Sequence, residues 1–374
     1  MRFLHTADWH IGKKLNDFDL LEDQQAVFEQ LVTVAKQQQV DAIVIAGDLY
    51  DRALPSEAAV ATLDHMLVTL NRKLNYPLLV ISGNHDSAVR LRTGRSWFSA
   101  TKMYVNTQLA EAFTPVELGD TQFFLLPYFE PFAVRDYFQD ATITNVAQAI
   151  RPIVAKMKAQ FKPDMRHILV SHFFAAGSDH SASETKVNVG GLDAVPIDDL
   201  AAFDYVALGH LHNHNALHAE PKIQYSGALL KYAVAEAKQE KGVYIVDTDT
   251  MTRTFIPLTP QHDLIELKAS YAELTDPDFY RQQDRDAYIG VDLTDTQVIP
   301  NVMAQLRKIY PRIISLRREN GVAAVKPLKQ RQRDLDPLSL LKKFYAEMMQ
   351  TDLTADQLKW AKAGLGEAES GQKQ

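Results

Sequence analysis

The stretch DAIVIAGDLYD, residues 41–51, decides the fold class that we expect for this chain. From Ala42 to Ala46 it is apolar without alternation, which is typical of a strand that is covered on both faces of a sheet. It then turns polar at once, with Gly47, Asp48 and Asp51. In α/β proteins ligands gather beyond the carboxyl ends of strands, so this stretch predicts a buried strand that leads into a functional loop.

Similar strand-like runs recur over the first 260 or so residues and alternate with segments of helical periodicity. Phe28 and Leu31 share one helical stripe with Leu21, and Ser56 follows Pro55 in a position suited to cap a second helix. The other strand-like runs end at Ala7, Ser82, Ser171 and Gly209. The pattern predicts an α/β sandwich over residues 1–262.

Composition narrows the class of protein further. The 374 residues are 46% hydrophobic and 23% charged, which is typical of a globular chain. The absence of cysteine excludes disulfides and thiolate metal ligands. We see no apolar run of membrane-spanning length and no signal-peptide pattern, so we expect a cytoplasmic protein with no membrane partner. The net charge of −7 argues against a strongly basic nucleic-acid binder, and any DNA affinity must come from local patches, bound cations or a partner.

Five polar clusters follow five of the expected strands. Side chains two residues apart on an extended segment point the same way, so Asp8 with His10, and His210 with His212, can each chelate one ion. Because strand ends of this kind meet in space, the five clusters predict one shared site. The clusters are Asp8-Trp9-His10-Ile11-Gly12, Gly47-Asp48-Leu49-Tyr50-Asp51, Gly83-Asn84-His85-Asp86, Ser171-His172 and Gly209-His210-Leu211-His212.

The donor set fits two six-coordinate ions that share a carboxylate. Nitrogen-rich donors favour Mn, Fe or Zn over Mg or Ca, and we expect two Mn²⁺ ions, with Fe²⁺ or Mg²⁺ as alternatives. Two ions about 3.5–4 Å apart can clamp a phosphodiester and activate a bridging water. The expected ligands are Asp8, His10, Asp48, Asn84, His172, His210 and His212.

His85 stands beside the expected ligands and suits a different role. It could protonate the departing oxygen of a phosphoester or stabilise charge on the phosphate. Either Asp51 or Asp86 could orient its ring, and the sequence leaves both open; our expected catalytic residues are His85 and Asp51. The remaining histidines are expected to be structural, and they are His5, His65, His167, His180, His214, His218 and His262.

The sequence pattern changes after residue 262. Three strand-like and two helical segments predict a small α+β unit over 263–325, followed by a basic linker over 326–335. A helical segment is expected over 336–366, with Pro337 at a first helical position and a capping box at Thr354 and Gln357. Residues 367–374 are polar and expected to be disordered.

Taken together, these motifs resemble the calcineurin-like metallophosphoesterase superfamily and, within it, the SbcD family of Mre-type break-repair nucleases. The resemblance implies a β-sandwich flanked by helices, an α+β capping domain and a C-terminal helical segment. It also assigns the ligands to two ions. One ion would take Asp8, His10, Asp48 and His212, and the other would take Asp48, Asn84, His172 and His210. His85 matches the catalytic histidine of that family.

The resemblance also implies an activity and partners. These are a 3′→5′ double-strand exonuclease and endonuclease acting on DNA ends and hairpins in repair, recombination and replication, near the nucleoid. The capping domain would help hold DNA, and the last helices would grip the coiled coil of an SbcC-like ATPase, with a homodimer inside a heterotetramer. Ala53 and Asp86 depart from the phosphatase motifs of the superfamily, which favours a nuclease. The rival interpretations are a phosphatase or small-molecule phosphodiesterase on the same scaffold, and a DNA-tethering or scaffold subunit with a vestigial site.

Two sets of residues are candidates for the macromolecular contacts. Arginines just beyond His85 could meet DNA phosphates. The helix after Pro337 has a wide apolar face that suits a partner. The candidate DNA-binding residues are Arg90, Arg92 and Arg95, and the candidate partner-binding residues are Leu338, Leu341, Phe344, Tyr345 and Met348.

Overall fold

The computed structural model describes residues 1–94, 98–179, 194–217, 220–297, 299–318, 337–349 and 352–371. These form two compact units. The larger consists of Met1–Val291 and Asn301–Leu316, and the smaller of Asp292–Pro300 and Arg317–Gln374. The candidate DNA-binding residue Arg95 and the predicted linker, 326–335, lie outside the described residues.

The larger unit is built around two sheets. The six-stranded sheet has the order β13-β12-β1-β4-β5-β6. Strands β1, β4, β5 and β6 are parallel to one another. At one edge, β12 pairs antiparallel with β1, and β13 pairs antiparallel with β12. Its strands are β1 (Arg2–Thr6), β4 (Ala42–Ala46), β5 (Leu78–Ile81), β6 (Met103–Asn106), β12 (Gly242–Asp247) and β13 (Thr252–Pro257). The five-stranded sheet has the order β11-β10-β9-β8-β7. Its strands are β7 (Val116–Leu118), β8 (Thr121–Leu125), β9 (Arg166–His172), β10 (Tyr205–Gly209) and β11 (Ile223–Tyr225).

Strand β4 shows why its sequence is apolar throughout. Ile43 and Ile45 point to one face and pack with Phe28 of a covering helix, while Val44 points to the other face and packs in a core shared with Phe123 of the second sheet. Each sheet therefore has one face against the other sheet and one face against helices. This arrangement confirms the predicted α/β sandwich.

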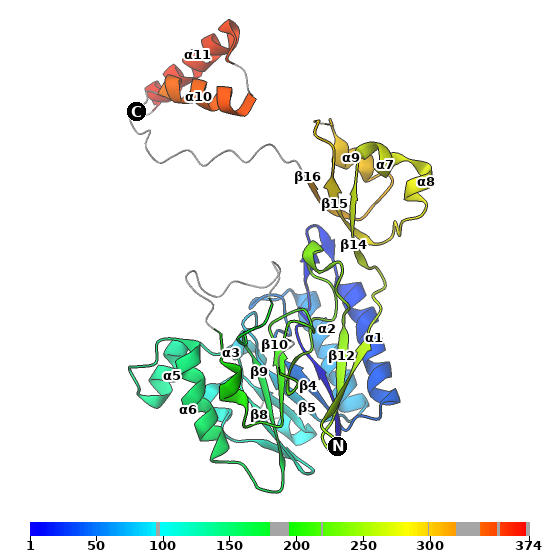
Figure 1. The fold of residues 1–374 in the computed structure, drawn as a ribbon, viewed down its shortest axis with the longest axis vertical. Coiled ribbons are helices and arrows are strands. Elements are labelled where there is room, and N and C mark those ends of the chain that lie inside the picture. Colours follow the sequence, from blue (N-terminus) through cyan, green and yellow to red (C-terminus); the bar gives the residue numbers. More distant parts are fainter. Residues whose placement is uncertain are drawn as a thin grey trace. The chain divides into compact units, whose positions relative to one another are not determined.

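Helices cover the two outer faces, α1 and α2 on one sheet and α5 and α6 on the other (Figure 1). Ser56 caps α2 as predicted, since its hydroxyl accepts the Ala59 N–H at 3.2 Å. The helices are α1 (Leu21–Gln37), α2 (Glu57–Val68), α3 (Ala88–Leu91), α5 (Pro131–Phe138) and α6 (Val146–Lys158). The short elements are β2 (Lys14–Leu15), β3 (Phe18–Asp19), η1 (Thr69–Lys73), η2 (Ser99–Thr101), η3 (Leu109–Glu111), η4 (Ile197–Leu200) and η5 (Val234–Glu236).

The region predicted as an α+β unit forms a three-stranded sheet, β14-β15-β16, with short helices. Residues 263–291 belong to the same compact unit as the sandwich, so the predicted boundary at 262 does not divide the two compact units. The elements are β14 (Leu264–Ala269), α7 (Tyr271–Thr275), α8 (Pro277–Tyr280), β15 (Tyr288–Leu293), α9 (Val302–Leu306) and β16 (Ile313–Arg318).

Two helices end the described chain, α10 (Pro337–Met349) and α11 (Ala355–Gly371). Thr354 and Gln357 form the predicted reciprocal cap, in which the Gln357 Oε1 accepts the Thr354 N–H at 2.9 Å and the Thr354 Oγ1 accepts the Gln357 N–H at 3.4 Å. The prediction of disorder from residue 367 differs from the structure, because α11 continues to Gly371 through good helix formers such as Glu367 and Ala368. Residues 372–374 lie outside the described residues. Among the described helices, none is long and apolar enough to cross a membrane.

Candidate metal centre

The carboxyl ends of β1, β4, β5, β9 and β10 meet at one edge of the sandwich. The ends of these strands and the loops that leave them carry all seven expected ligands, and the structure brings their side chains together from positions as far apart in the chain as Asp8 and His212. Five of the seven are almost fully buried, with exposed fractions of at most 3%; these are Asp8, His10, Asp48, His172 and His212.

One half of the cluster joins the first and the last loop. The Nε2 atoms of His10 and His212 lie 3.1 Å apart, and Asp8 offers a carboxylate oxygen within 4.8 Å of both. The Oδ2 atom of Asp48 lies 3.7 Å from the His10 Nε2. Because 3.1 Å is shorter than two metal–nitrogen bonds of about 2.1 Å each, one cation can bind both imidazoles.

The other half gathers around Asn84. Its Oδ1 atom lies 3.0 Å from the His172 Nε2 and 3.0 Å from the His210 Nδ1. The His172 Nε2 also lies 3.3 Å from the Asp48 Oδ2. The same carboxylate oxygen of Asp48 therefore faces both halves of the cluster, as a bridging ligand must.

Two of the buried histidines, His172 and His212, are fixed so that one nitrogen of each faces the centre. The Nδ1 of His172 lies 2.8 Å from the Ala46 carbonyl oxygen, which can only accept, so Nδ1 carries the proton and Nε2 presents its lone pair. The Nδ1 of His212 lies 3.1 Å from the Glu236 Oε1, which assigns the same tautomer. Such outer partners orient metal-binding imidazoles and raise their basicity.

Two supporting residues of the centre were not singled out from the sequence. Glu236 is fully buried and pairs with Lys241, whose Nζ lies 2.6 Å from Oε2. Gln24, from α1, holds the first loop, because its amide donates to the His10 carbonyl at 2.8 Å and its Oε1 accepts the Gly12 N–H at 3.0 Å. No local motif marks either residue, since each lies in an ordinary helical or loop sequence.

The charge balance of the centre favours cations. Burial raises the pKa of the Asp8 carboxyl to about 7. Burial acts in the same direction on Asp48, but the adjacent His172 outweighs it and holds the pKa of Asp48 well below its usual range. Carboxylates that are removed from water in this way need a compensating positive charge. Two divalent ions would supply it, so the residues present fit a dimetal site.

Backbone strain concentrates at the same positions. Asp8, His10, Asp48 and His210 have positive φ angles of 52°, 46°, 52° and 97°. Such conformations cost of the order of 1 kcal/mol or more for residues with a side chain and persist at functional sites when the surrounding structure enforces them. Here each one turns a side chain from the end of a strand toward the shared centre.

The glycines that precede the ligands leave space for neighbouring loops. A Cβ on Gly83 would lie 2.1 Å from the Asp48 Oδ1, and a Cβ on Gly47 would lie 2.5 Å from the His172 Nδ1. Gly47 also has a φ of 90°, which disfavours any other residue. The backbone is therefore packed against the ligands.

His85 lies at the open side of the centre. The Nδ1 of its ring is 2.8 Å from the backbone carbonyl oxygen of Asp51, and its backbone N–H donates to the Asp48 Oδ1 at 2.9 Å. The centroid of its ring is 4.7 Å from that of the His10 ring. The carboxylate of Asp86 instead accepts the N–H groups of Leu49, Tyr50 and Gly83 at 2.9–3.1 Å. Of the two candidates for orienting His85, the structure thus places Asp51 at the ring, through its carbonyl group.

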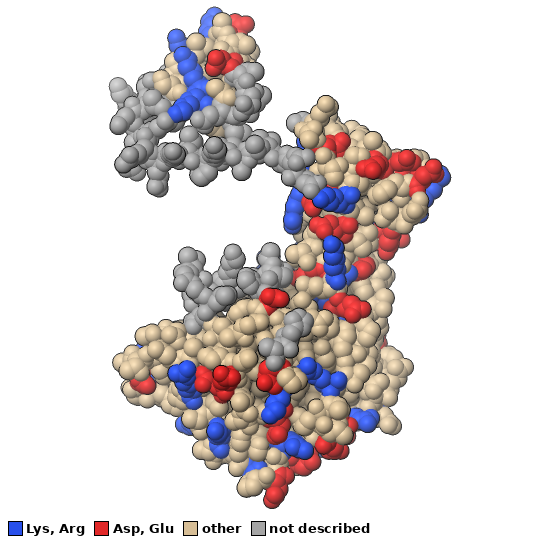
Figure 2. Space-filling view, viewed as in Figure 1, with Lys and Arg blue, Asp and Glu red and all other residues tan. Residues whose placement is uncertain are grey.

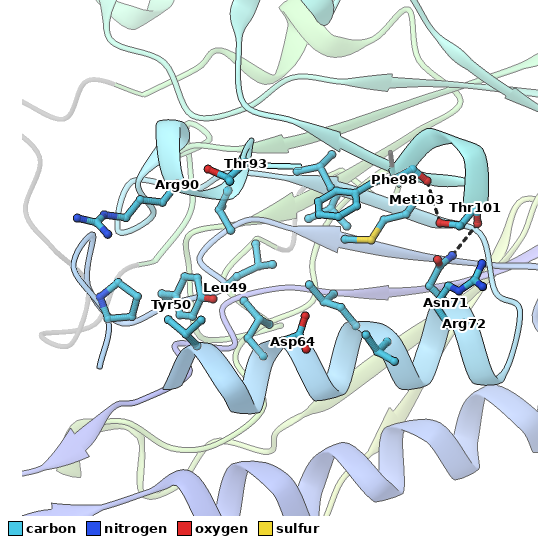
Figure 3. A pocket seen from close by; sticks show the side chains of 18 residues that line it. Leu49, Tyr50, Asp64, Asn71, Arg72, Arg90, Thr93, Phe98, Thr101 and Met103 are labelled. Atoms are coloured by element: carbon cyan, nitrogen blue, oxygen red, sulfur yellow. Dashed lines mark hydrogen bonds between the residues drawn. The ribbon is translucent and has the colours of Figure 1, made fainter. Parts of the chain in front are cut away.

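The candidate DNA-binding arginines lie farther along the same loop. Arg90, on α3, and Arg92, just after it, are both exposed. Arg90 reaches outward at one end of a largely apolar pocket of about 600 Å³ between α2 and strands β5 and β6 (Figure 3). The structure therefore places Arg90 beside this apolar pocket, which the candidate metal ligands do not line.

Comparisons with known proteins agree with this geometry. A family profile described as calcineurin-like phosphoesterase matches residues 1–214, and one described as type 5 capsule protein repressor C-terminal domain matches residues 260–349. The SbcD subunit of the SbcCD nuclease of Staphylococcus epidermidis is 36% identical over 319 residues, which cover 84% of this chain and 85% of that protein. The chain belongs to the SbcD family of nuclease subunits. This membership confirms the predicted family and a metal-dependent phosphodiesterase, in place of the phosphatase alternative.

Solved structures with similar folds are more distant. A protein of Thermus thermophilus is 13% identical, with a TM-score of 0.40, and the match covers 69% of this chain and 99% of that one. A dimetal phosphatase from Danio rerio is 12% identical, with a TM-score of 0.41, and the match covers 66% of this chain and 91% of that one.

The candidate partner-binding residues lie on α10. Phe344 and Leu341 are 51% and 37% exposed, and Leu338 and Tyr345 are half-buried. The Tyr345 hydroxyl accepts a hydrogen bond from the Gln357 amide of α11 at 2.9 Å. The side chain of Met348 lies outside the description.

Proposed function

We propose that this protein is the Mn²⁺-dependent nuclease subunit of an ATP-dependent complex and that it cuts DNA at ends and hairpins, as a 3′→5′ exonuclease and an endonuclease. The observation that carries this proposal is the position of Asp48, whose Oδ2 faces His172 at 3.3 Å and His10 at 3.7 Å. Membership of the SbcD family supports DNA as the substrate.

Asp8, His10, Asp48 and His212 would hold one ion, and Asp48, Asn84, His172 and His210 the other. When bound, the ions supply Lewis acidity and an activated water. The nitrogen-rich donor set supports Mn²⁺, with Fe²⁺ as the nearest alternative and Mg²⁺ the less suited one.

His85 acts on the departing oxygen of the substrate. Its Nδ1 is held by the Asp51 carbonyl, so that its Nε2 is the atom available to transfer a proton. The contact between the His85 N–H and the Asp48 Oδ1 fixes the backbone of His85 relative to the bridging carboxylate. We therefore assign proton transfer to His85 and a positioning role to Asp51.

The partner is a coiled-coil ATPase of the SbcC kind, bound through the exposed apolar side chains of α10, and two such heterodimers form a heterotetramer. The relative from Staphylococcus epidermidis is named as part of SbcCD, which supports this assignment. Exposed Phe344 and Leu341 suit the apolar groove of a helical partner. A DNA substrate and an ATPase partner place the protein in the cytoplasm, near the nucleoid.

The test is cleavage of linear duplex DNA, labelled at the 3′ or the 5′ end, by the purified chain with Mn²⁺ and with or without a cognate ATPase. We expect shortening from 3′ ends that EDTA abolishes. A His85→Ala variant should bind Mn²⁺ normally and lose cleavage by about two orders of magnitude. Turnover of p-nitrophenyl phosphate without any cleavage of DNA would contradict the proposal and favour a phosphatase.

A further inference from the structure

A second set of side chains lies at the mouth of the metal centre. An open cavity of about 510 Å³ is lined by Asn84 and His85 and also by two cationic residues. Its lining residues are Lys13, Asp51, Arg52, Ala53, Asn84 and His85. The same cavity is therefore lined by a candidate metal ligand, by the proposed acid and by positively charged side chains.

Asp51 holds this arrangement together. Its Oδ1 lies 2.7 Å from the Lys13 Nζ and its Oδ2 lies 3.4 Å from the Arg52 Nε, while its carbonyl oxygen holds His85 at 2.8 Å. The Lys13 and Asp51 side chains are 22% and 10% exposed, so their pair is only partly in water. The Asp51 carboxylate thus holds two cations near His85, the proposed acid. Lys13, Arg52 and Asp51 together carry a formal charge of +1.

Lys13 is fixed in this position by its loop. Its N–H donates to the His10 carbonyl at 2.9 Å, and its own carbonyl accepts the Leu20 N–H at 3.1 Å. The next residue, Lys14, behaves differently, because its side chain is 57% exposed and lies 3.7 Å from Asp19 on the neighbouring short strand. The two lysines are adjacent in sequence, but only Lys13 faces the cavity.

The local charge matters because the protein as a whole is acidic. The net charge is −7, and on the face shown in Figure 2 basic and acidic side chains are interspersed over the described surface. A polyanionic strand is repelled by such a molecule unless a local cluster receives its phosphates. Lys13 and Arg52 supply cations at the place where a strand must enter to reach the metals.

We propose that Lys13 binds a phosphate of the DNA strand next to the scissile phosphate and thereby selects polynucleotides over small phosphoesters. The inference rests on the proposed nuclease function and adds a specificity-determining residue to that site. A lysine ammonium has three donors, so Lys13 can keep Asp51 as a partner while it also donates to a phosphate oxygen. Arg52, which is 80% exposed, contributes a weaker contact to the same strand.

The test compares Lys13→Met with Lys14→Met as the matched control, and with Lys13→Arg as the conservative variant. Three quantities are measured: kcat and KM on a duplex oligonucleotide, kcat/KM on bis(p-nitrophenyl) phosphate, and bound Mn²⁺ per chain. We expect Lys13→Met to lower kcat/KM on DNA about ten- to hundredfold, mainly through KM, because a charged hydrogen bond is lost. The salt slope of DNA binding should fall by about one.

Turnover of bis(p-nitrophenyl) phosphate should distinguish the loss of a contact with a neighbouring phosphate from a general defect of the metal centre. This ester has no second phosphate, so Lys13→Met should turn it over within about twofold of the wild type and keep its Mn²⁺. Lys14→Met should match the wild type on both substrates, and Lys13→Arg should recover most of the activity on DNA. Equal losses on both substrates, or wild-type activity of Lys13→Met on DNA, would overturn the inference and leave the nuclease function intact. A wild-type protein that neither binds nor cleaves DNA would overturn both.

Discussion

Replacing Glu236 by glutamine tests how this residue contributes both to the metal centre and to the stability of the fold. The wild-type carboxylate is fully buried and has two strong partners, the His212 Nδ1 at 3.1 Å and the Lys241 Nζ at 2.6 Å. Glu236→Gln preserves the shape of the side chain but removes its charge. Lys241 would keep its hydrogen bonds to the His212 carbonyl and to Gln239. Its buried ammonium group would, however, no longer have the Glu236 carboxylate as its counter-charge.

Two magnitudes follow from these contacts. Breaking a buried ion pair by removing one partner costs about 3–5 kcal/mol, so the free energy of unfolding of the metal-free protein should fall by roughly that amount. Loss of the carboxylate behind His212 should weaken metal binding about 10- to 100-fold. Glu240, which is exposed and four residues further on, provides the control variant Glu240→Gln, for which neither quantity should change.

The assays are urea unfolding in EDTA and calorimetric titration with Mn²⁺. The double variant Glu236→Gln/Lys241→Met removes both charges, so it should recover most of the lost stability while its affinity for Mn²⁺ stays low. Wild-type affinity in the Glu236→Gln variant would refute the role of Glu236 in orienting His212. Unchanged stability in the single variant would refute the importance of the buried pair.

Three further changes test other parts of the structure. Gly83→Ala places a Cβ 2.1 Å from the Asp48 Oδ1, so elemental analysis should find at least one Mn²⁺ lost per chain, whereas Gly364→Ala, with open space around its Cβ, should retain both. Burial lowers the pKa of His5 to about 3. Between about pH 6.5 and pH 3 the unfolded chain therefore binds a proton at His5 that the folded chain does not. The free energy of unfolding consequently falls as the pH falls through this range, by at most about 1.4 kcal/mol per pH unit. Urea unfolding in EDTA should show a shallower acid slope for His5→Gln, and equal slopes would count against this account. Phe344→Asp should abolish co-purification with the ATPase while Mn²⁺ content stays normal; retained complex would argue against α10 as the partner surface.

Much of the site could be predicted because its ligands follow strands directly. A run such as Ile43–Ala46 is recognisable by its composition, and the polar residues after it must lie at the edge of the sheet. Parallel strand order then brings Asp48 and Asn84 together, because they follow the neighbouring strands β4 and β5. His172 ends β9 in the other sheet and reaches them only through the packing of the two sheets. The expected structural role of His214 also agrees with its position, stacked 3.8 Å from the Phe255 ring.

The supporting contacts could not be predicted in the same way. Glu236 and Lys241 contact the centre only because η5 and the following loop lie beside His212. Lys13 and Lys14 look equivalent in the sequence, and only the fold directs one of them to Asp51. Such contacts depend on packing between distant segments, whereas the ligand motifs depend on the local end of a strand.

The most direct test of the central claim is anomalous diffraction at the manganese edge from crystals of the protein grown with Mn²⁺. We predict two anomalous peaks about 3.5–4 Å apart on either side of the Asp48 carboxylate, one beside His10 and His212 and the other beside Asn84 and His172. A single peak, or two peaks that do not share Asp48, would contradict the account.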